Sequence, residues 1–418
     1  MADRGVGTDR PPSGPPNAPA GRTRATVLLI ALRFGYAYNW FDIGPALPRI
    51  GSTFAVGPAA WGLLVAGFLV GAGATQVPAG FLARRHGERP VALAGVGLLA
   101  LAALAGAFSP SYAVLLATRV AAGIGAGLFF SPAIGWVGRL FGPGERGLPV
   151  GTFSSAFSAG AAAGVVGAAL LVPAVGWQAN LALGALGLGL TTAVAWAAIP
   201  RSAEGLPGPD PEPGKQAGAA WRSRSVVAVG IAFVGFEGAT FATGQFVVPF
   251  GEVVRLWPAW LAGAVGSSFV LPSIVGGPVG GVVSERSMRH RTQLAGVTVV
   301  GAAALAALPL AGVAAAVAIG SVFSFAYGFA YAVMYVLPHY WTELPAREVP
   351  LAIGLFNAIQ LGGGALVSAL FGWVVASWSY AVGWEFVALV QVAALLALVA
   401  MRPTVGAHRP AEGASGPP

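Results

Sequence analysis

Four ionisable side chains lie inside long apolar stretches of this sequence, where a charge is costly unless it has a partner, water or a function. They are Arg33, Asp42, Arg119 and Glu237. A carboxyl group in low-dielectric surroundings favours its neutral form, so Asp42 and Glu237 are candidates for taking up and releasing a proton. Arginine keeps its charge, so Arg119 is a candidate for binding an anion.

Each candidate also has a structural interpretation. Arg119 and Asp42 could form a fixed ion pair, and Glu237 could stay protonated or hydrogen-bonded, with Gln245 two turns away as a partner. Arg33 lies nearer the end of its apolar segment, so we expect its side chain to reach water there.

Polar side chains accompany these charges. Tyr327, Tyr331, Tyr335 and His339 recur every four residues, which places them on one face of a helix. Hydroxyl and amide groups have no partners in lipid, so such a face is expected to line a polar path, with ring packing and helix–helix hydrogen bonds as the alternative. The candidate substrate-contacting residues of this kind are Tyr36, Asn39, Trp40, Tyr327, Tyr331, Asn357 and Gln360.

The composition indicates a helical membrane protein. Of 418 residues, 56% are hydrophobic, and the mean hydropathy is +0.75. The apolar runs are apolar on every face, whereas strands of a membrane barrel would alternate. The chain has no cysteine and four scattered histidines, and we find no phosphate-binding loop, so we expect no metal, no cofactor and no use of ATP.

Twelve apolar runs have the length of a membrane span. Nineteen of the 23 basic residues fall on the side that holds both termini, two fall on the other side, and Arg33 and Arg119 lie inside spans. This asymmetry predicts a multi-pass protein of the plasma (inner) membrane with both termini cytoplasmic, and it argues against nucleic-acid binding. The expected helices lie at about 26–48, 57–82, 91–109, 111–132, 150–173, 179–199, 225–249, 258–283, 293–311, 314–337, 350–377 and 380–401.

The spans divide into two halves. Segments starting at Gly80 and Gly151 are echoed about 200 residues later by segments starting at Gly281 and Gly354, which indicates a duplicated six-helix unit. The resulting domains are a disordered tail (1–24), an N-terminal bundle (25–200), a Pro/Gly-rich linker (201–224), a C-terminal bundle (225–401) and a second tail (402–418).

The stretch "GFLARRHGER" that follows the second span resembles a signature of the major facilitator superfamily of secondary transporters, Gly-x-x-x-Asp-Arg-x-Gly-Arg-Arg. The family acid is replaced here by arginine, and the second copy keeps an acid but has Met288 in place of a glycine. The resemblance implies a short cytoplasmic hairpin that holds the two halves together. The gate-motif residues are Gly80, Arg84, Arg85, Gly87 and Arg89, with Gly281, Glu285 and Arg286 in the second copy.

The fourth span carries an arginine before spaced glycines, Arg119 followed by Gly123, Gly125 and Gly127, which also resembles this family. The Gly-Pro signature of the family's antiporters is not found in the fifth span. The resemblance implies an all-α fold of two pseudo-symmetric six-helix bundles, with spans 1, 4, 7 and 10 around a central cavity.

The resemblance further implies a monomeric carrier that moves a small solute by alternating access. From the charged residues we expect a proton as the coupling ion and a small organic or inorganic anion as the substrate. An exporter of amphipathic, drug-like compounds is the first alternative. A membrane enzyme or a receptor on the same fold is the second, although no paired catalytic groups stand out.

Overall fold

A computed structural model describes residues 19–141, 147–199, 219–287, 289–341, 344 and 348–402, and all regular structure within them is helical. Its elements are α1 (Pro19–Phe41), η1 (Gly44–Ala46), α2 (Leu47–Phe54), α3 (Pro58–His86), α4 (Glu88–Ala107), α5 (Tyr112–Arg139), α6 (Gly147–Ala198), α7 (Ala219–Arg222), α8 (Arg224–Val253), α9 (Ala259–Ser268), α10 (Ser273–Arg286), α11 (His290–Ala307), η3 (Leu308–Leu310), α12 (Val313–Val336), η4 (Leu337–Tyr340), α13 (Val349–Ser377), α14 (Tyr380–Ala394) and η6 (Leu395–Ala400).

The predicted twelve-span fold is confirmed. Among the described residues, ten helices are long and apolar enough to cross a membrane. One of them, α6, is interrupted at Gly176, whose φ of 85° is readily adopted only by glycine, so this element makes two passes. The twelfth span is α1, whose three arginines lower its hydropathy.

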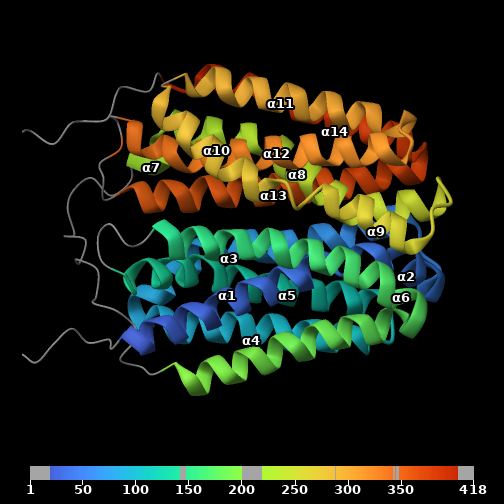
Figure 1. Cartoon of the computed structure of the whole chain (residues 1–418), viewed down its shortest axis with the longest axis horizontal. Coiled ribbons are helices and arrows are strands. Elements are labelled where there is room, and N and C mark those ends of the chain that lie inside the picture. Colours follow the sequence, from blue (N-terminus) through green and yellow to red (C-terminus); the bar gives the residue numbers. More distant parts are fainter. Residues whose placement is uncertain are drawn as a thin grey trace, which may run out of the picture.

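The spans form two bundles that lie side by side in Figure 1, α1 to α6 in one and α8 to α14 in the other. The end at which α1 and α8 begin is called the terminal side here, and the opposite end is called the α2 side. The described chain also ends at the terminal side, because the amide of Arg402 donates to the hydroxyl of Ser225 near the start of α8.

Glycines bring helices within a bundle into close contact, as the spacing in the fourth span predicts. A Cβ atom on Gly123 of α5 would overlap the carbonyl oxygen of Phe68 in α3, and one on Gly127 would overlap Thr75. On the other face of α5, a Cβ on Gly125 would lie 2.5 Å from the amide nitrogen of Leu99 in α4. Small residues of this kind allow backbones to approach in lipid, where no hydrophobic effect drives helices together.

The two bundles meet along α3 and α13 and along α6 and α9. Their closest contacts lie toward the α2 side, where a Cβ on Gly62 of α3 would be 2.7 Å from the carbonyl oxygen of Ser368 in α13. Gln245 of α8 donates there to the carbonyl oxygen of Trp40 in α1 at 2.7 Å. The bundles are therefore packed tightly against each other at this side.

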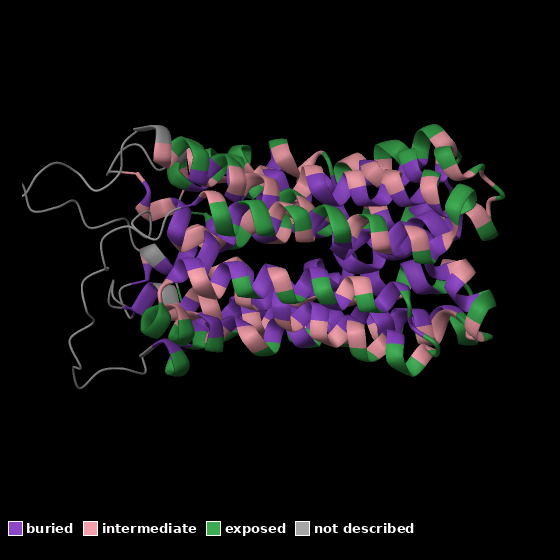
Figure 2. Ribbon diagram, turned by 90° about the horizontal axis from the view of Figure 1, so that it is seen from below, coloured by how far each residue is buried: buried purple, intermediate pink, exposed green. Residues whose placement is uncertain are grey.

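The surface that would face lipid is apolar. Large exposed side chains such as Leu101, Leu190 and Leu366 lie on the outward faces of α4, α6 and α13. Figure 2 shows buried residues concentrated inside the bundles and exposed residues on their outer faces and ends. This is the pattern expected where hydrocarbon is the solvent.

Several predicted boundaries differ from the structure. The helix of the first span begins at Pro19, inside the predicted tail, and ends at Phe41 instead of residue 48. Pro45 and Pro48 lack amide hydrogens, so the chain continues as the short elements η1 and α2. Most of the predicted linker (201–224), the first 18 residues and residues 403–418 lie outside the described residues, whereas α7 forms a short helix at the linker's end.

We predict that Gly123→Ala destabilises the N-terminal bundle, because the added methyl group must separate α3 from α5. Overpacking of this kind typically costs about 1–3 kcal/mol, which would appear as a lower melting temperature of the purified protein. The matched control is Gly138→Ala in the same helix, where a Cβ would meet nothing within 4 Å. Equal melting temperatures for the two variants would contradict this account of the packing.

Candidate functional site

Aromatic rings close the space between the bundles toward the α2 side. Trp40 and Phe41 of α1 pack on Phe241 of α8 with ring centroids 5.2 and 5.7 Å apart, and Phe157 of α6 packs on both α1 rings. These four residues are called the aromatic plug. Because they come from both bundles, the plug must separate for a path to open at this side.

Polar side chains follow the plug in the C-terminal bundle. Glu237 lies one turn before Phe241 on α8, and its carboxylate accepts a hydrogen bond of 3.1 Å from the hydroxyl of Tyr327. Tyr327, Tyr331 and Tyr335 follow one face of α12, as their spacing predicts, and the last two share a hydrogen bond of 2.9 Å. The expected contact between Glu237 and Gln245 is not formed, because Gln245 donates to Trp40 of α1 instead.

The hydrogen bonds continue onto α13. The hydroxyl of Tyr335 donates to Oδ1 of Asn357 at 2.7 Å, and Nε2 of Gln360 donates to the same oxygen at 2.7 Å. Tyr331, Tyr335, Asn357 and Gln360 therefore form one hydrogen-bonded network, and Glu237 and Tyr327 form a separate pair next to it. The rings of Tyr327 and Tyr331 touch, with centroids 5.7 Å apart. His339 lies further along in η4.

Arg33 lies on α1 in the N-terminal bundle, and its environment differs from the one expected. Its guanidinium lies 4.4 to 5.4 Å from the ring centroids of Tyr36, Phe130, Phe153 and Phe157. Only 7% of the residue is exposed. Because α1 begins at Pro19, Arg33 lies about 21 Å into the helix, too deep for the predicted contact with water at its end.

The two bundles bring these groups close together. The hydroxyl of Tyr36 lies close enough to both Tyr331 and Glu237 to interact with them electrostatically. Tyr331 is also close enough to Arg33 to interact with its positive charge. Tyr36, Glu237, Tyr327 and Tyr331 are thus gathered at the junction of α1, α8 and α12.

Asp42, Arg119 and Asn39 lie elsewhere in the N-terminal bundle. Arg119 stacks over Phe68 and donates to the carbonyl oxygen of Asn39 at 3.3 Å. Both carboxylate oxygens of Asp42 are buried near the backbone amides of Asp42 and Ile43, and no side chain among the described residues donates to them. Within the described ranges, no ion pair joins Arg119 to Asp42, although the two attract each other electrostatically. They are therefore not held as the contact ion pair that was one interpretation of the sequence.

Comparison with known proteins places this arrangement in a family. A model of the Major Facilitator Superfamily matches residues 29–344, well over half of the chain. The chain belongs to the major facilitator superfamily. The fold expected from the sequence resemblance is confirmed by this match.

Two curated relatives in the family are named for resistance and export. The chain is 33% identical over 171 residues to the multidrug resistance protein Stp of Mycobacterium tuberculosis (strain CDC 1551 / Oshkosh), a match covering 39% of this chain and 32% of that protein. It is 31% identical over 173 residues to the tetracenomycin C resistance and export protein of Streptomyces glaucescens, covering 40% and 32%. The chain thus spans about a third of the length of these relatives.

Solved structures of the superfamily share the fold over nearly the whole chain. One is a bacterial homologue of the human lysosomal transporter Spinster, in an inward-facing and unoccupied conformation, with a TM-score of 0.72, 17% identity, and 92% of this chain and 96% of that chain covered. Another is a D-xylose–proton symporter, with a TM-score of 0.72, 15% identity, and 91% and 97% covered.

The superfamily motif after α3 makes contacts within its own bundle. Gly87 has a φ of 88° and forms the turn between α3 and α4, as expected from its position. Arg89 donates to the carbonyl oxygens of Trp196 and Ile199 at the end of α6, while Glu88 pairs with Arg139 of α5.

The other residues of the motif make no such contacts within the described ranges. Arg84 and Arg85, and in the second copy Glu285 and Arg286, are exposed, and Gly80 and Gly281 have open space around them. The role of the motif in joining the halves stays a prediction.

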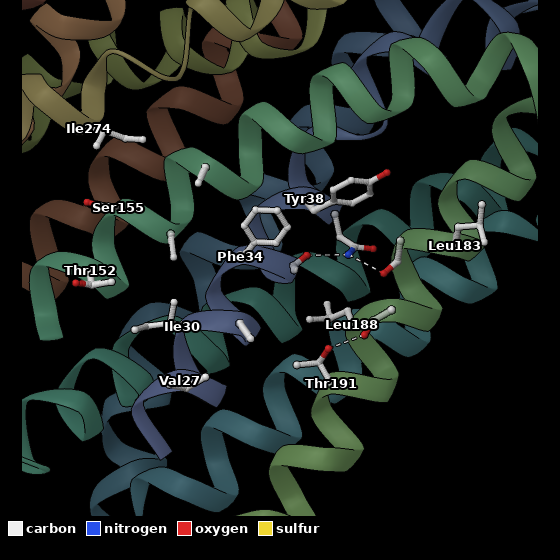
Figure 3. Close-up of a pocket in the computed structure, with 17 residues that line it drawn as sticks. Val27, Ile30, Phe34, Tyr38, Thr152, Ser155, Leu183, Leu188, Thr191 and Ile274 are labelled. Atoms are coloured by element: carbon white, nitrogen blue, oxygen red, sulfur yellow. Dashed lines mark hydrogen bonds between the residues drawn. The ribbon is translucent and has the colours of Figure 1, made fainter. Parts of the chain in front are cut away.

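A separate pocket of about 840 Å³ lies between α1 and the two arms of α6. Figure 3 shows Phe34 and Tyr38 of α1 facing it, with Leu183 and Leu188 of α6 on another wall, and Ile274 of the other bundle nearby. Asn39 lines it and donates to the carbonyl oxygens of Gly35 and Gly184. Its walls are mainly apolar. They lie on the opposite face of α1 from Arg33 and the four rings around its guanidinium, Tyr36, Phe130, Phe153 and Phe157, which are called the Arg33 cage.

Sequence reasoning missed the aromatic surroundings of Arg33 and the partner of Glu88. The spacing of Phe153 and Phe157, one helical turn apart, was the available signal, but nothing in it shows that Arg33 lies between them. Among the residues that the structure describes, no three His, Asp or Glu side chains come together as a metal site would require.

We predict that the aromatic plug controls access from the α2 side. In this cysteine-free chain, a single Tyr331→Cys reporter should react with a membrane-impermeant maleimide only from the terminal side. Adding Phe241→Ala should allow reaction from the α2 side as well, because one ring of the plug is lost. The control is Phe246→Ala on the same helix, whose ring packs on Phe371 within the C-terminal bundle. Unchanged labelling after Phe241→Ala would show that the plug does not close the path.

Proposed function

We propose that this protein is a secondary transporter in which the two bundles alternate in exposing the junction of α1, α8 and α12 to either side of the membrane. The terminal side is then the cytoplasmic side, in keeping with the distribution of basic residues. The observation that carries the proposal is the gathering of Glu237, its partner Tyr327 and the facing Tyr36 where both bundles meet. Sites of solute carriers lie in such a place, near the midplane and between the repeats.

A proton is the proposed coupling ion. Glu237 is 5% exposed. The hydrogen bond from Tyr327 is the only one that the Glu237 side chain makes among the described residues. A hydroxyl can donate to the ionised carboxylate and accept from the protonated acid, so Tyr327 suits both states. The similarity in fold to a D-xylose–proton symporter is compatible with this role.

Export of amphipathic compounds is the second candidate. The rings of the plug and of the Arg33 cage form a surface that would bind an aromatic body, and two relatives are named for multidrug resistance and for tetracenomycin C export. The apolar pocket between α1 and α6 gives such compounds a place to leave the lipid. The same junction would serve both candidates, which differ in the solute carried and in the direction of its movement.

We predict that Glu237→Gln separates coupling from carriage. Glutamine preserves the shape and can still accept from Tyr327, but it cannot carry a proton. In proteoliposomes, accumulation driven by a proton gradient should fall by about tenfold or more, while exchange of labelled solute across the membrane continues. Glu252→Gln, near the end of the same helix, is the matched control. Wild-type accumulation by Glu237→Gln would remove this residue from the coupling step.

We also predict that a covalent link between the bundles arrests transport. The hydroxyls of Ser158 in α6 and Ser273 in α10 lie 2.9 Å apart across the bundle interface. In the double variant Ser158→Cys and Ser273→Cys, the thiols are placed to form a disulfide on oxidation, because the bond requires such proximity. Solute exchange should stop after oxidation and return after reduction, and each single variant should be insensitive. Full exchange in the oxidised double variant would contradict the rocking of two bundles.

A further inference from the structure

The most unusual group in the membrane-spanning region is the guanidinium of Arg33. Four aromatic rings surround it, from α1, α5 and α6, with centroids 4.4 to 5.4 Å away. Ring faces attract a cation, and each such contact contributes about 0.5–2 kcal/mol. The rings therefore hold the guanidinium in place, and the hydroxyl of Tyr36 is the one polar group among them.

The hydrogen-bonding capacity of Arg33 is largely unused. Its Nε and one terminal nitrogen are buried and make no hydrogen bond, and the hydroxyl of Tyr36 lies within hydrogen-bonding reach of the guanidinium. No carboxylate forms an ion pair with it among the described residues. An arginine cannot shed its charge to escape this situation, and a buried charge without a partner is strongly destabilising. An arginine retained in such a position is best explained by a partner that arrives from outside the chain.

The position of Arg33 fits a ligand at the proposed transport site. Its cage includes Tyr36 and Phe157, and Phe157 is also part of the aromatic plug. Tyr331, on the opposite bundle, lies within electrostatic reach of the guanidinium. An anion on Arg33 would therefore lie between the bundles, with the hydrogen-bonded network of α12 and α13 on its other side.

Arg119 is less suited to this task. Its guanidinium already donates to the carbonyl oxygen of Asn39, and it lies over Phe68 inside the N-terminal bundle, where it is attracted by Asp42. The charge of Arg119 is thus partly compensated by a carboxylate, whereas Arg33 has three phenylalanine rings and the ring and hydroxyl of Tyr36 around it.

We propose that Arg33 binds the carboxylate of the transported solute, and that the surrounding rings bind a flat, aromatic body attached to it. This inference rests on the proposed function and narrows its substrate class to aromatic monocarboxylates. The guanidinium fork matches the two oxygens of a carboxylate. Tyr36 and Phe157 belong to the cage and also pack on Trp40 next to it, so their rings offer apolar faces for such a body.

Binding to the purified full-length protein tests this without depending on transport. Titration calorimetry would compare benzoate, phenylacetate and 4-hydroxybenzoate with their uncharged amides, and with nitrate and phosphate as inorganic anions. We expect at least one aromatic carboxylate to bind about tenfold or more tightly than its amide. Amides that bind equally well, or binding of the inorganic anions alone, would overturn the proposal.

Variants then assign the binding to Arg33. Arg33→Met keeps the length and the apolar stem but removes the charge, so carboxylate binding should fall to the level of the amide. Because the unpaired charge is also removed, the melting temperature should stay the same or rise. Arg33→Lys keeps the positive charge but removes the two-pronged guanidinium, so it should still bind carboxylates, more weakly than the wild type. A less stable Arg33→Met that binds carboxylates normally would identify Arg33 as a structural residue.

Failure of the proposed substrate class can be distinguished from failure of the proposed transport function. If solute exchange and its arrest by the Ser158–Ser273 disulfide are observed, but no aromatic carboxylate binds, then the carrier assignment stands and the substrate class is wrong. If aromatic carboxylates bind through Arg33 but no solute is exchanged, then the binding site stands and the carrier assignment is wrong.

Discussion

Hydrocarbon offers no hydrogen bonds, so each polar group between the membrane surfaces must find its partner within the protein or at a water-filled path. This constraint explains where the polar residues of the chain lie. Glu237 is hydrogen-bonded to Tyr327, and Tyr331, Tyr335, Asn357 and Gln360 form a second hydrogen-bonded group beside this pair on α12 and α13. The exposed faces of the outer helices carry leucine and valine instead.

The same constraint makes close packing by glycine necessary. Lipid tails are as apolar as leucine, so helices associate through van der Waals contact and interhelical hydrogen bonds. Gly123 and Gly127 let α3 and α5 touch within one bundle, while Gly62 and Gly372 let α3 and α13 touch across the two. The intrabundle contacts give each half a rigid body. The closest interbundle contacts lie toward the α2 side, and these are the ones that would have to break in the proposed alternation of the two bundles.

The fold and the tyrosine stripe on α12 could be predicted from the sequence. Span length, the charge asymmetry and the spacing of Arg119 and its glycines predict the fold, because each reports a local property of a helix. The stripe of tyrosines on α12 was predictable for the same reason. The partners of Glu237 and the cage of Arg33 were not, because they depend on how segments more than 80 residues apart come together.

The arrangement of Arg33 and Glu237 gives the proposed function a simple coupling mechanism. In the proposed carrier, an anion bound at Arg33 brings a negative charge to the junction that also holds Glu237, and a negative charge nearby favours the protonated form of a carboxyl group. Each ligand then increases the affinity for the other, as linkage requires. Two charges would then cross the interface together as a neutral pair, and neither a lone anion nor a lone proton would lower the cost of rearranging the bundles in lipid. A carrier that needs only one acid and one arginine at its centre can remain as apolar as this chain.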